Sequence, residues 1–278
     1  MEIKKYFSFT KLKIIAIFLV VFFVLFIFVS IANDYKFNFW DANYDLSQNK
    51  QEVEDEVFYS EEIEPVPKEE TLSSAPQNSL KIKKDEIIIK NVPFTLQAPL
   101  AEWDDPRQQD GCEEASALMA VYWAQNKTLT PQSAREQILK ISDFQEKNYG
   151  TYIDTFATAT AERIIRGYFS YDKVEVFENI KIDQIIEALE AGHLVIVPTD
   201  GQKLKNPFYT APGPERHNLV IKGFDYRMDE FITNDPGTRR GENYRYNKNI
   251  LFEAIRDYPT GDHKPIKENI KTMIVVKK

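Results

Sequence analysis

The pattern of hydrophobic and polar positions divides the chain into three stretches. Residues 14–32 form an apolar run without a charge, which at about 1.5 Å per residue just spans a hydrocarbon core of roughly 30 Å as a helix. Residues 33–85 are polar and acidic, so they cannot bury enough apolar surface to fold and predict a disordered linker. From residue 86 to residue 278, strand-like and helical patterns alternate with turn signals, which predicts a folded domain.

Within this domain, helical patterns come mostly first and strand patterns mostly later. Ala115, Leu118 and Met119 recur at helical spacing, and Thr130 before Pro131 is a typical helix start. The predicted helices cover residues 113–125, 131–141, 154–165 (capped by Asp154) and 182–190. The predicted strands cover residues 87–89, 92–96, 174–177, 194–198, 219–224, 230–233 and 272–276. This order predicts an α+β fold, with a helical lobe packed on an antiparallel sheet.

The charges around the apolar run predict its orientation. Four lysines lie within residues 4–13, whereas Asp34 and Asp41 follow the run. The positive-inside rule then predicts a cytoplasmic N-terminus over residues 1–13, one transmembrane helix over 14–32 and an extracytoplasmic C-terminal domain at the cell membrane. A cleaved signal peptide is the alternative, because Ser30-Ile31-Ala32 is a passable cleavage site, although the run is longer than most signal-peptide apolar regions. Both interpretations export the domain.

Composition excludes several classes of function. The net charge of -8 and the pI of about 5.2 argue against nucleic acid as a partner. The chain has one cysteine, so neither an internal disulfide nor a cysteine-rich zinc site can form. Its three histidines are widely separated, and we therefore expect no metal site.

The single cysteine, Cys112, lies where a nucleophile would be activated. The thiolate is the reactive form of cysteine, and the N-terminus of a helix favours it through the dipole and the free N–H groups. Cys112 follows Gly111 at the predicted start of such a helix. The alternative is a small buried apolar residue. Glu113 and Glu114 favour that alternative, because neighbouring carboxylates disfavour a thiolate.

Two predicted strands supply a candidate base and its partner. His217 opens one strand and Asp235 follows the end of the next, and a short turn over residues 226–229 would bring them together. A carboxylate beside an imidazole fixes its tautomer and stabilises the imidazolium. His193, after a predicted helix end, and His263, in a loop rich in Pro, Gly and Asp, are weaker candidates.

A side-chain amide is the further group that such chemistry uses, because it can stabilise a tetrahedral oxyanion together with the N–H of the nucleophile. Gln97 ends the strand-like segment 92–96, and Gln108 and Gln109 lie nearer to Cys112 in the sequence. The residues alone leave the choice among the three glutamines open, and each of them could equally be an ordinary solvated amide.

Taken together, these blocks resemble the peptidase C39-like family, relatives of the peptidases that trim bacteriocin leader peptides. The similarity covers about residues 92–278, and it rests on residues 92–97 (VPFTLQ), 110–116 (DGCEEAS), 217–225 (HNLVIKGFD) and 234–237 (NDPG). The resemblance implies a papain-like fold with Cys112 as nucleophile, His217 as base, Asp235 as orienting residue and Gln97 as oxyanion donor. Many relatives have Gly where this chain has Glu113. Transporter domains are absent, so export of double-glycine substrates is not implied.

The leading hypothesis is therefore a cysteine peptidase, or related thiol hydrolase, that acts on peptide or isopeptide bonds of a peptide or protein substrate. It would need neither a metal nor an organic cofactor. One alternative is a non-catalytic surface module that binds ligands on the same scaffold. Another is a transamidase or acyltransferase, which would use the same Cys112, His217 and Asp235 with a different acceptor.

Overall fold

The computed structural model describes residues 85–278. The predictions for the N-terminal segment 1–13, the transmembrane helix 14–32 and nearly all of the linker 33–85 lie outside the described residues. Among the helices from residue 85 onward, none is both long enough and apolar enough to cross a membrane.

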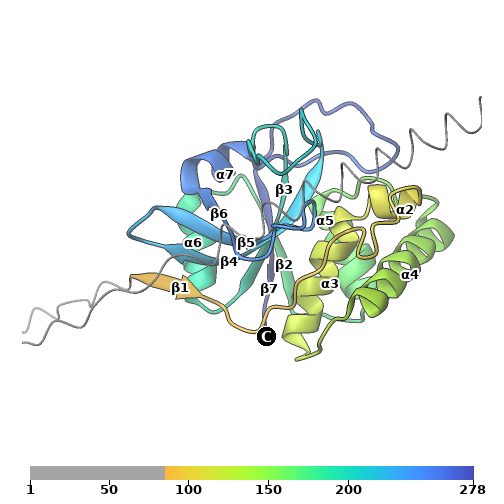
Figure 1. Cartoon of the computed structure of the whole chain (residues 1–278), viewed down its shortest axis with the longest axis horizontal. Coiled ribbons are helices and arrows are strands. Elements are labelled where there is room, and N and C mark those ends of the chain that lie inside the picture. Colours follow the sequence, from red (N-terminus) through yellow and green to blue (C-terminus); the bar gives the residue numbers. More distant parts are fainter. Residues whose placement is uncertain (1–84) are drawn as a thin grey trace, which may run out of the picture. The chain divides into compact units, whose positions relative to one another are not determined.

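The described chain contains both strands and helices, in an order close to the predicted one (Figure 1). The strands are β1 (Glu86–Ile88), β2 (Val174–Glu178), β3 (Leu194–Thr199), β4 (His217–Asp225), β5 (Glu230–Asn234), β6 (Tyr244–Asn247) and β7 (Thr272–Val276). The helices are α2 (Pro106–Gln109), α3 (Cys112–Ala124), α4 (Pro131–Tyr149), α5 (Ala157–Ala159), the π-helix η2 (Thr160–Tyr168), α6 (Ile182–Glu190) and α7 (Lys248–Ala254).

The strands form one seven-stranded antiparallel sheet in the order β2-β7-β3-β4-β5-β6, with β1 paired to β4. Every residue of β3 and β4 is buried, because helices and neighbouring strands cover both faces. The antiparallel register brings the start of β4, the end of β3 and the end of β5 together at one end of the central strands. The predicted α+β class is confirmed.

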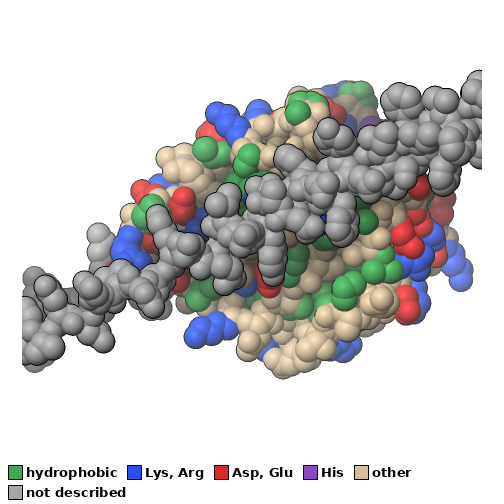
Figure 2. Space-filling model, viewed as in Figure 1, with side chains coloured by type: hydrophobic (Ala, Val, Ile, Leu, Met, Phe, Trp, Pro, Cys, Tyr) green, Lys and Arg blue, Asp and Glu red, His purple; other side chains and the backbone are tan. Residues whose placement is uncertain are grey.

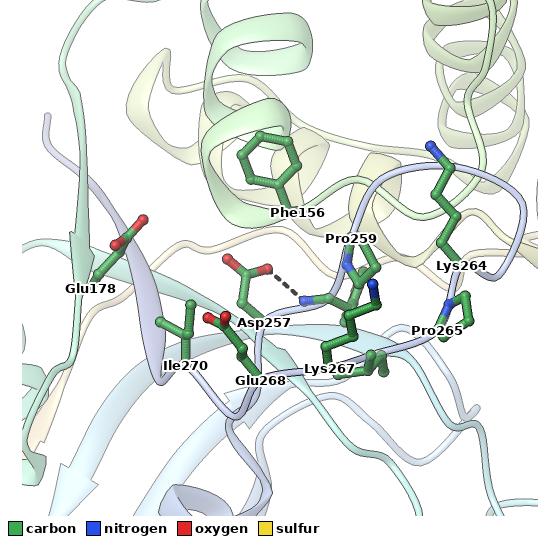
Figure 3. A pocket seen from close by; sticks show the side chains of 11 residues that line it. Phe156, Glu178, Asp257, Pro259, Lys264, Pro265, Lys267, Glu268 and Ile270 are labelled. Carbon is green, nitrogen blue, oxygen red and sulfur yellow. Dashed lines mark hydrogen bonds between the residues drawn. The ribbon is translucent and has the colours of Figure 1, made fainter.

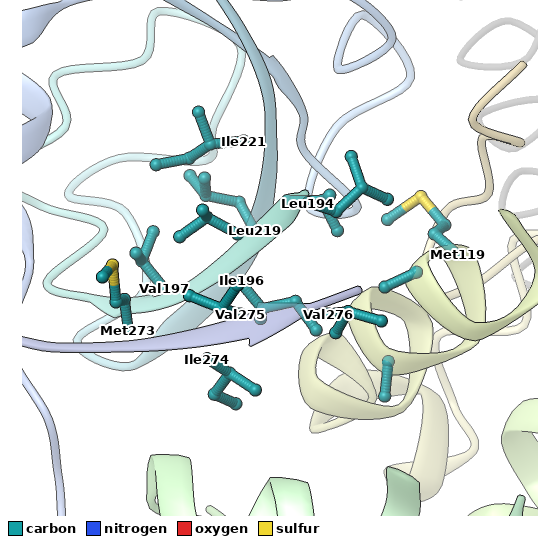
Figure 4. Packing of buried hydrophobic residues seen from close by; sticks show 14 of the residues in the cluster. Met119, Leu194, Ile196, Val197, Leu219, Ile221, Met273, Ile274, Val275 and Val276 are labelled. Atoms are coloured by element: carbon teal, nitrogen blue, oxygen red, sulfur yellow. The ribbon is translucent and has the colours of Figure 1, made fainter. Parts of the chain in front are cut away.

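Helices cover the sheet, and α3 is the one that packs into its centre. Figure 1 shows α2, α3 and α4 together on one side of the sheet, and α6 and α7 on the other side of the view. Met119 of α3 faces Leu194 of β3 and Val276 of β7 (Figure 4). Each such fully buried aliphatic side chain contributes roughly 1.5–3 kcal/mol. This packing holds the N-terminus of α3 at a fixed place relative to β4.

Ion pairs join α2 and the segment before it to α4 at the surface of the helical lobe. Arg107 contacts Asp143 at 2.8 Å, and Arg135 is paired with Glu102. Figure 2 shows acidic and basic side chains next to one another at this edge of the molecule. Exposed pairs of this kind contribute roughly 0–1 kcal/mol each, so the apolar packing of α3 dominates the placement of the lobe.

Two local predictions are wrong. Residues 92–96 form no strand, although the next residue, Gln97, donates its backbone N–H to the carbonyl of Pro236 at 3.0 Å. Asp154 does not cap a helix: its φ is +49°, and its carboxylate binds His263. The helix begins instead at Ala157 as α5 and continues as η2 to Tyr168.

Candidate active site

Cys112 is the first residue of α3. A Cβ on Gly111 would lie 2.8 Å from the carbonyl oxygen of Arg107, so the close approach of α2 to α3 requires glycine at this position. No side chain caps the helix, and the first-turn N–H groups, including that of Cys112, have no partner within it. The thiol is buried, with 6% of the residue exposed.

His217 and Asp235 form the buried pair that the sequence suggested. His217 begins β4, Asp235 directly follows β5, and His217 Nε2 lies 2.8 Å from Asp235 Oδ1. A Cβ on Gly237 would lie 2.8 Å from His217 Cε1, so the tight turn after Asp235 leaves room for the imidazole only because residue 237 is glycine. The structure thus brings the two residues together, while their catalytic roles stay a prediction.

The Asp235 carboxylate is fully buried and richly hydrogen-bonded. Its donors are His217 Nε2 and Gly237 N on Oδ1, and Tyr209 OH, Tyr246 OH and Asn206 Nδ2 on Oδ2. Burial alone would raise the pKa of Asp235, but the charge of His217 and the hydrogen bonds from His217, Tyr209 and Tyr246 outweigh burial and lower it. The carboxylate is therefore ionised at neutral pH.

The hydrogen bond to Asp235 fixes the direction of the imidazole. Because Nε2 faces Asp235, Nδ1 is the nitrogen left for proton transfer, and it makes no hydrogen bond with any residue of the described region. The ring of Tyr209 packs edge-on against the ring of His217, with centroids 5.5 Å apart. Tyr209 thus holds both the imidazole and its carboxylate partner.

The Cys112 thiol lies beside the start of β4 but is hydrogen-bonded elsewhere. The Asn218 N–H is close enough to the sulfur to favour its thiolate. The thiol itself donates to Glu113 Oε2 at 3.0 Å, and no hydrogen bond within residues 85–278 joins it to His217. Burial, followed by the negative charge of Glu113, raises the pKa of Cys112 well above that of a free thiol. In this conformation the sulfur is protonated.

Glu113 is the centre of a second buried hydrogen-bond network. Its Oε1 accepts from Tyr258 OH at 2.7 Å and from Thr155 N at 3.2 Å. Tyr258 OH in turn accepts from Asn218 Nδ2 at 2.7 Å. Burial raises the pKa of Glu113 to about 7, even though these hydrogen bonds favour its ionised form. Sequence reasoning counted Glu113 only as a disfavouring charge, and it missed Tyr258, which is 145 residues away.

Glu114 points away from the thiol. Its Oε1 accepts from Gln145 Nε2 at 2.7 Å on α4, while Oε2 is buried without a hydrogen-bond partner in the described region. Burial, followed by the charge of Glu113, raises the pKa of Glu114 well above its ordinary value. Burial therefore favours the protonated form of Glu114, as it does for Glu113.

The three candidate oxyanion glutamines all use their amide nitrogens for other contacts. Gln97 Nε2 donates to the carbonyls of Gln108 at 3.2 Å and Gln109 at 2.6 Å. Gln108 donates to Glu102, and Gln109 donates to the carbonyl of Trp103. Gln97 is the one whose backbone also contacts Pro236, next to Asp235, so it links the segment before Cys112 to the turn after β5.

The remaining histidines lie outside this centre. His263 Nδ1 lies 2.9 Å from Asp154 Oδ2, and His263 Nε2 lies 3.9 Å from Asp110. These contacts tie the loop that follows α7 to the segment before α5 and to the segment before α3. His193 follows the end of α6, where its N–H donates to the carbonyl of Ala188. No cluster of His, Cys, Asp and Glu within residues 85–278 has the geometry of a metal site.

A cavity of about 520 Å³ lies between α5 and the loop after α7 (Figure 3). Figure 3 shows Phe156 above the cavity, and Asp257 and Pro259 below it. Glu178 lies at one end of the cavity and Lys264 at the other. Its lining is Phe156, Glu178, Asp257, Tyr258, Pro259, Lys264, Pro265, Ile266, Lys267, Glu268 and Ile270. Because Tyr258 also binds Glu113, one residue joins this cavity to the thiol network.

Comparison with known proteins gives a family and a likeness to solved structures. The model of the Peptidase_C39 like family matches residues 89–259, a range that includes Cys112, His217, Asp235 and Gln97. A solved structure from Bacillus anthracis, described as a C39-like peptidase, is similar at 16% identity, with a TM-score of 0.45, over 70% of this chain and 99% of that one. No curated protein matches the chain.

Proposed function

This chain belongs to the Peptidase_C39 like family, and on that premise we propose that it is a membrane-anchored cysteine peptidase, or related thiol hydrolase, that acts on peptide or isopeptide bonds outside the cytoplasm. One observation carries the proposal: Cys112 begins α3 beside the strand on which His217 is hydrogen-bonded to Asp235. A helix that presents a cysteine to a histidine on an antiparallel sheet is the papain-type arrangement.

The first half of the reaction forms a thioester. His217 Nδ1 takes the Cys112 proton, the sulfur bonds to the carbonyl carbon of the substrate, and the carbonyl oxygen becomes an oxyanion. The C–N bond then breaks, and the leaving amine receives the proton held by His217. Asp235 orients the imidazole through Nε2 and stabilises its charged form throughout.

The second half releases the product. Water gives a proton to His217 Nδ1 and attacks the thioester carbonyl, the C–S bond breaks, and the proton returns to the sulfur. The free N–H of Cys112 is one donor to the oxyanion, and Gln97 Nε2 is the second, after it turns from the carbonyls of Gln108 and Gln109. The thiol must likewise turn from Glu113 toward His217, a rotation about the Cα–Cβ bond of Cys112.

The apolar run at residues 14–32 and the lysines before it support the location of this domain outside the cytoplasm, tethered to the membrane. Protease treatment of intact cells tests this part separately. The domain should be degraded without lysis, whereas protection until lysis would contradict an exported domain.

A non-catalytic binding module is the second candidate, and the state of the thiol favours it. Cys112 is buried, protonated and hydrogen-bonded to a carboxylate, as an inert structural cysteine would be. The His217–Asp235 pair favours the enzyme, because a buried imidazole with an ionised partner serves no evident purpose in a module that only binds.

The decisive experiment is a search for cleaved peptide bonds. The full chain, purified in detergent, is incubated with a complex peptide mixture, and new termini are identified by mass spectrometry. We expect cleavage that Cys112→Ala abolishes and that His217→Ala reduces by roughly 10⁶-fold.

His263→Ala is the matched control, because this histidine lies outside the centre, and it should cleave normally. Adding a primary amine distinguishes hydrolysis from transamidation by the mass of the product. Cleavage that survives Cys112→Ala contradicts the mechanism, and no cleavage by the unaltered protein would favour the binding module.

A further inference from the structure

The carboxylate beside the candidate nucleophile is buried, and it is bound on both oxygens. Glu113 is 2% exposed. Oε2 accepts the thiol hydrogen of Cys112 at 3.0 Å, while Oε1 accepts from Tyr258 OH at 2.7 Å and from Thr155 N at 3.2 Å. Its contact with the reacting sulfur therefore involves one oxygen only, and the other oxygen is anchored to the surrounding structure.

The groups around Glu113 do not stabilise its negative charge with a cation. The titratable groups that act on Glu113 are Cys112 and Glu114 on α3, Tyr258 after α7 and Asp154 before α5. Asp110 acts on Glu114, and Asp257 acts on Tyr258. No lysine, arginine or histidine within residues 85–278 is paired with Glu113, and His217 is paired with Asp235. Since the remaining neighbours are acids or phenols, Glu113 is readily neutralised by a proton.

We propose that Glu113 is the proton partner of Cys112, that the two side chains share one proton in the resting site, and that the charge of Glu113 restrains the thiol until the carboxyl is neutralised. This inference rests on the proposed function, because it assigns a regulator to the same thiol. The proposal assigns a specific role to Glu113, which stands where many relatives have Gly.

The exchange is a simple proton transfer. The thiol and the carboxylate (S–H and COO⁻) convert to the thiolate and the carboxylic acid (S⁻ and COOH) by movement of one proton along the 3.0 Å hydrogen bond. No electron moves, and the pair carries one negative charge in both forms. In the second form the carboxyl donates a hydrogen bond to the thiolate, whereas in the first form the proton stays on the sulfur.

A shared proton predicts a characteristic titration. Two groups that interact this strongly lose their protons in two macroscopic steps that belong to the pair. The first step gives mainly the carboxylate with a small fraction of thiolate, and the second, at higher pH, gives the thiolate outright. Thiol reactivity should therefore rise to a low plateau and then rise again.

The test measures alkylation of the full chain in detergent by iodoacetamide between about pH 5 and pH 10.5. Intact mass spectrometry reports on Cys112 alone, because the chain contains one cysteine. For the unaltered protein we expect the two-step profile. Glu113→Gln keeps the Oε1 acceptor for Tyr258 and Thr155 but removes the charge, and it should give one step and about tenfold faster alkylation at pH 7.5, equivalent to a thiol pKa lower by about one unit.

Glu114→Gln is the matched control. It makes the same chemical change one residue along the helix, at a carboxyl that is hydrogen-bonded to Gln145 instead of the thiol. Because the charge of Glu114 acts on the thiol more weakly than that of Glu113, we expect a clearly smaller acceleration than in Glu113→Gln. An equal acceleration in Glu114→Gln would mean that any loosening of the helix exposes the thiol, and it would overturn the proposal.

The remaining outcomes separate this inference from the proposed function. A single step in the unaltered protein overturns the shared proton, even if Glu113→Gln fails to fold. If Glu113→Gln accelerates alkylation and adding His217→Ala removes the gain, both ideas stand. If the gain survives the loss of His217, Glu113 controls the thiol but His217 is not its base.

Discussion

Two buried carboxylates lie at the candidate site, and the structure shifts their pKa values in opposite directions. Asp235, after β5, and Glu113, at the start of α3, are both almost completely buried, and both accept hydrogen bonds on each oxygen. The pKa of Asp235 is lowered, whereas that of Glu113 is raised to about 7. Burial acts in the same direction on both, so it does not explain the difference.

The difference comes from the partner. Asp235 faces a histidine that can carry a positive charge, and it also accepts from two tyrosines and an amide N–H. Glu113 has a thiol and a tyrosine as its side-chain donors, and its charged neighbours are acidic. Hydrogen bonds from neutral donors are therefore insufficient to offset burial here, and a cation decides which carboxylate stays ionised.

Asp235→Asn removes the ionised carboxylate of the two, and we expect it to have the largest effect on peptide cleavage. The amide can still accept from Tyr209 and Tyr246, but it no longer stabilises the imidazolium of His217 or fixes its tautomer. We expect the rate of peptide cleavage to fall by roughly 10³–10⁴-fold. The measurement is the turnover of a peptide identified in the cleavage screen.

Circular dichroism serves as the folding control for this variant. A loss of less than about tenfold in a folded Asp235→Asn protein would mean that the His217–Asp235 pair is structural, and that the cleavage uses another base.

The pH dependence of the free energy of unfolding tests the other carboxylate, Glu113. A carboxyl whose pKa is raised by folding binds its proton more tightly in the folded state, so its contribution is greatest at low pH and is lost as pH rises toward the folded value. For Glu113 this window runs from 4.5 to about 7, and a change of this size corresponds to about 3 kcal/mol.

The free energy of unfolding in urea should therefore fall across this window in the unaltered protein and fall less in Glu113→Gln. The pKa of Glu114 is also raised on folding, partly by the charge of Glu113, so the difference between the two curves reports Glu113 together with that part of the Glu114 shift. Parallel curves for the two proteins would show that Glu113 is ionised at an ordinary pKa.

The sequence predicted the placement of His217, Asp235 and Cys112 well because the signals there are local. The strand that starts at His217 and the turn over residues 226–229 determine a β4–β5 hairpin, and hairpin register then brings Asp235 to the histidine. The Gly before Cys112 and the helical spacing after it determined the start of α3. The α+β class followed from the same periodicities.

What the sequence could not predict depends on contacts between distant segments. The role of Glu113 comes from Tyr258, 145 residues away, in a loop whose sequence carries no periodic signal. Asp154 looked like a helix cap, but its carboxylate is used by His263, 109 residues further on. Residues 92–96 have a strand-like composition, yet they lie beside the sheet without joining its ladder. In each case tertiary contacts overrode the local preference.

Tyr258→Phe makes the smallest change, because it removes one oxygen from the Glu113 network. Glu113 loses a donor, and Asn218 Nδ2 loses its acceptor in a buried position. We expect a loss of about 1–3 kcal/mol in the free energy of unfolding, measured in urea. The pKa of Glu113 should rise further, because the lost hydrogen bond favours its ionised form. The first alkylation step of Cys112 should then move to higher pH.

Tyr226→Phe is the matched control for this variant, since its hydroxyl donates to Glu190 at an exposed position, and it should change the stability by less than about 0.5 kcal/mol. If Tyr258→Phe is as mild as this control and leaves the first alkylation step unmoved, the hydroxyl does not support the ionised state of Glu113. The contrast with Asp235 would then rest on the neighbouring charges alone, without a contribution from the tyrosine.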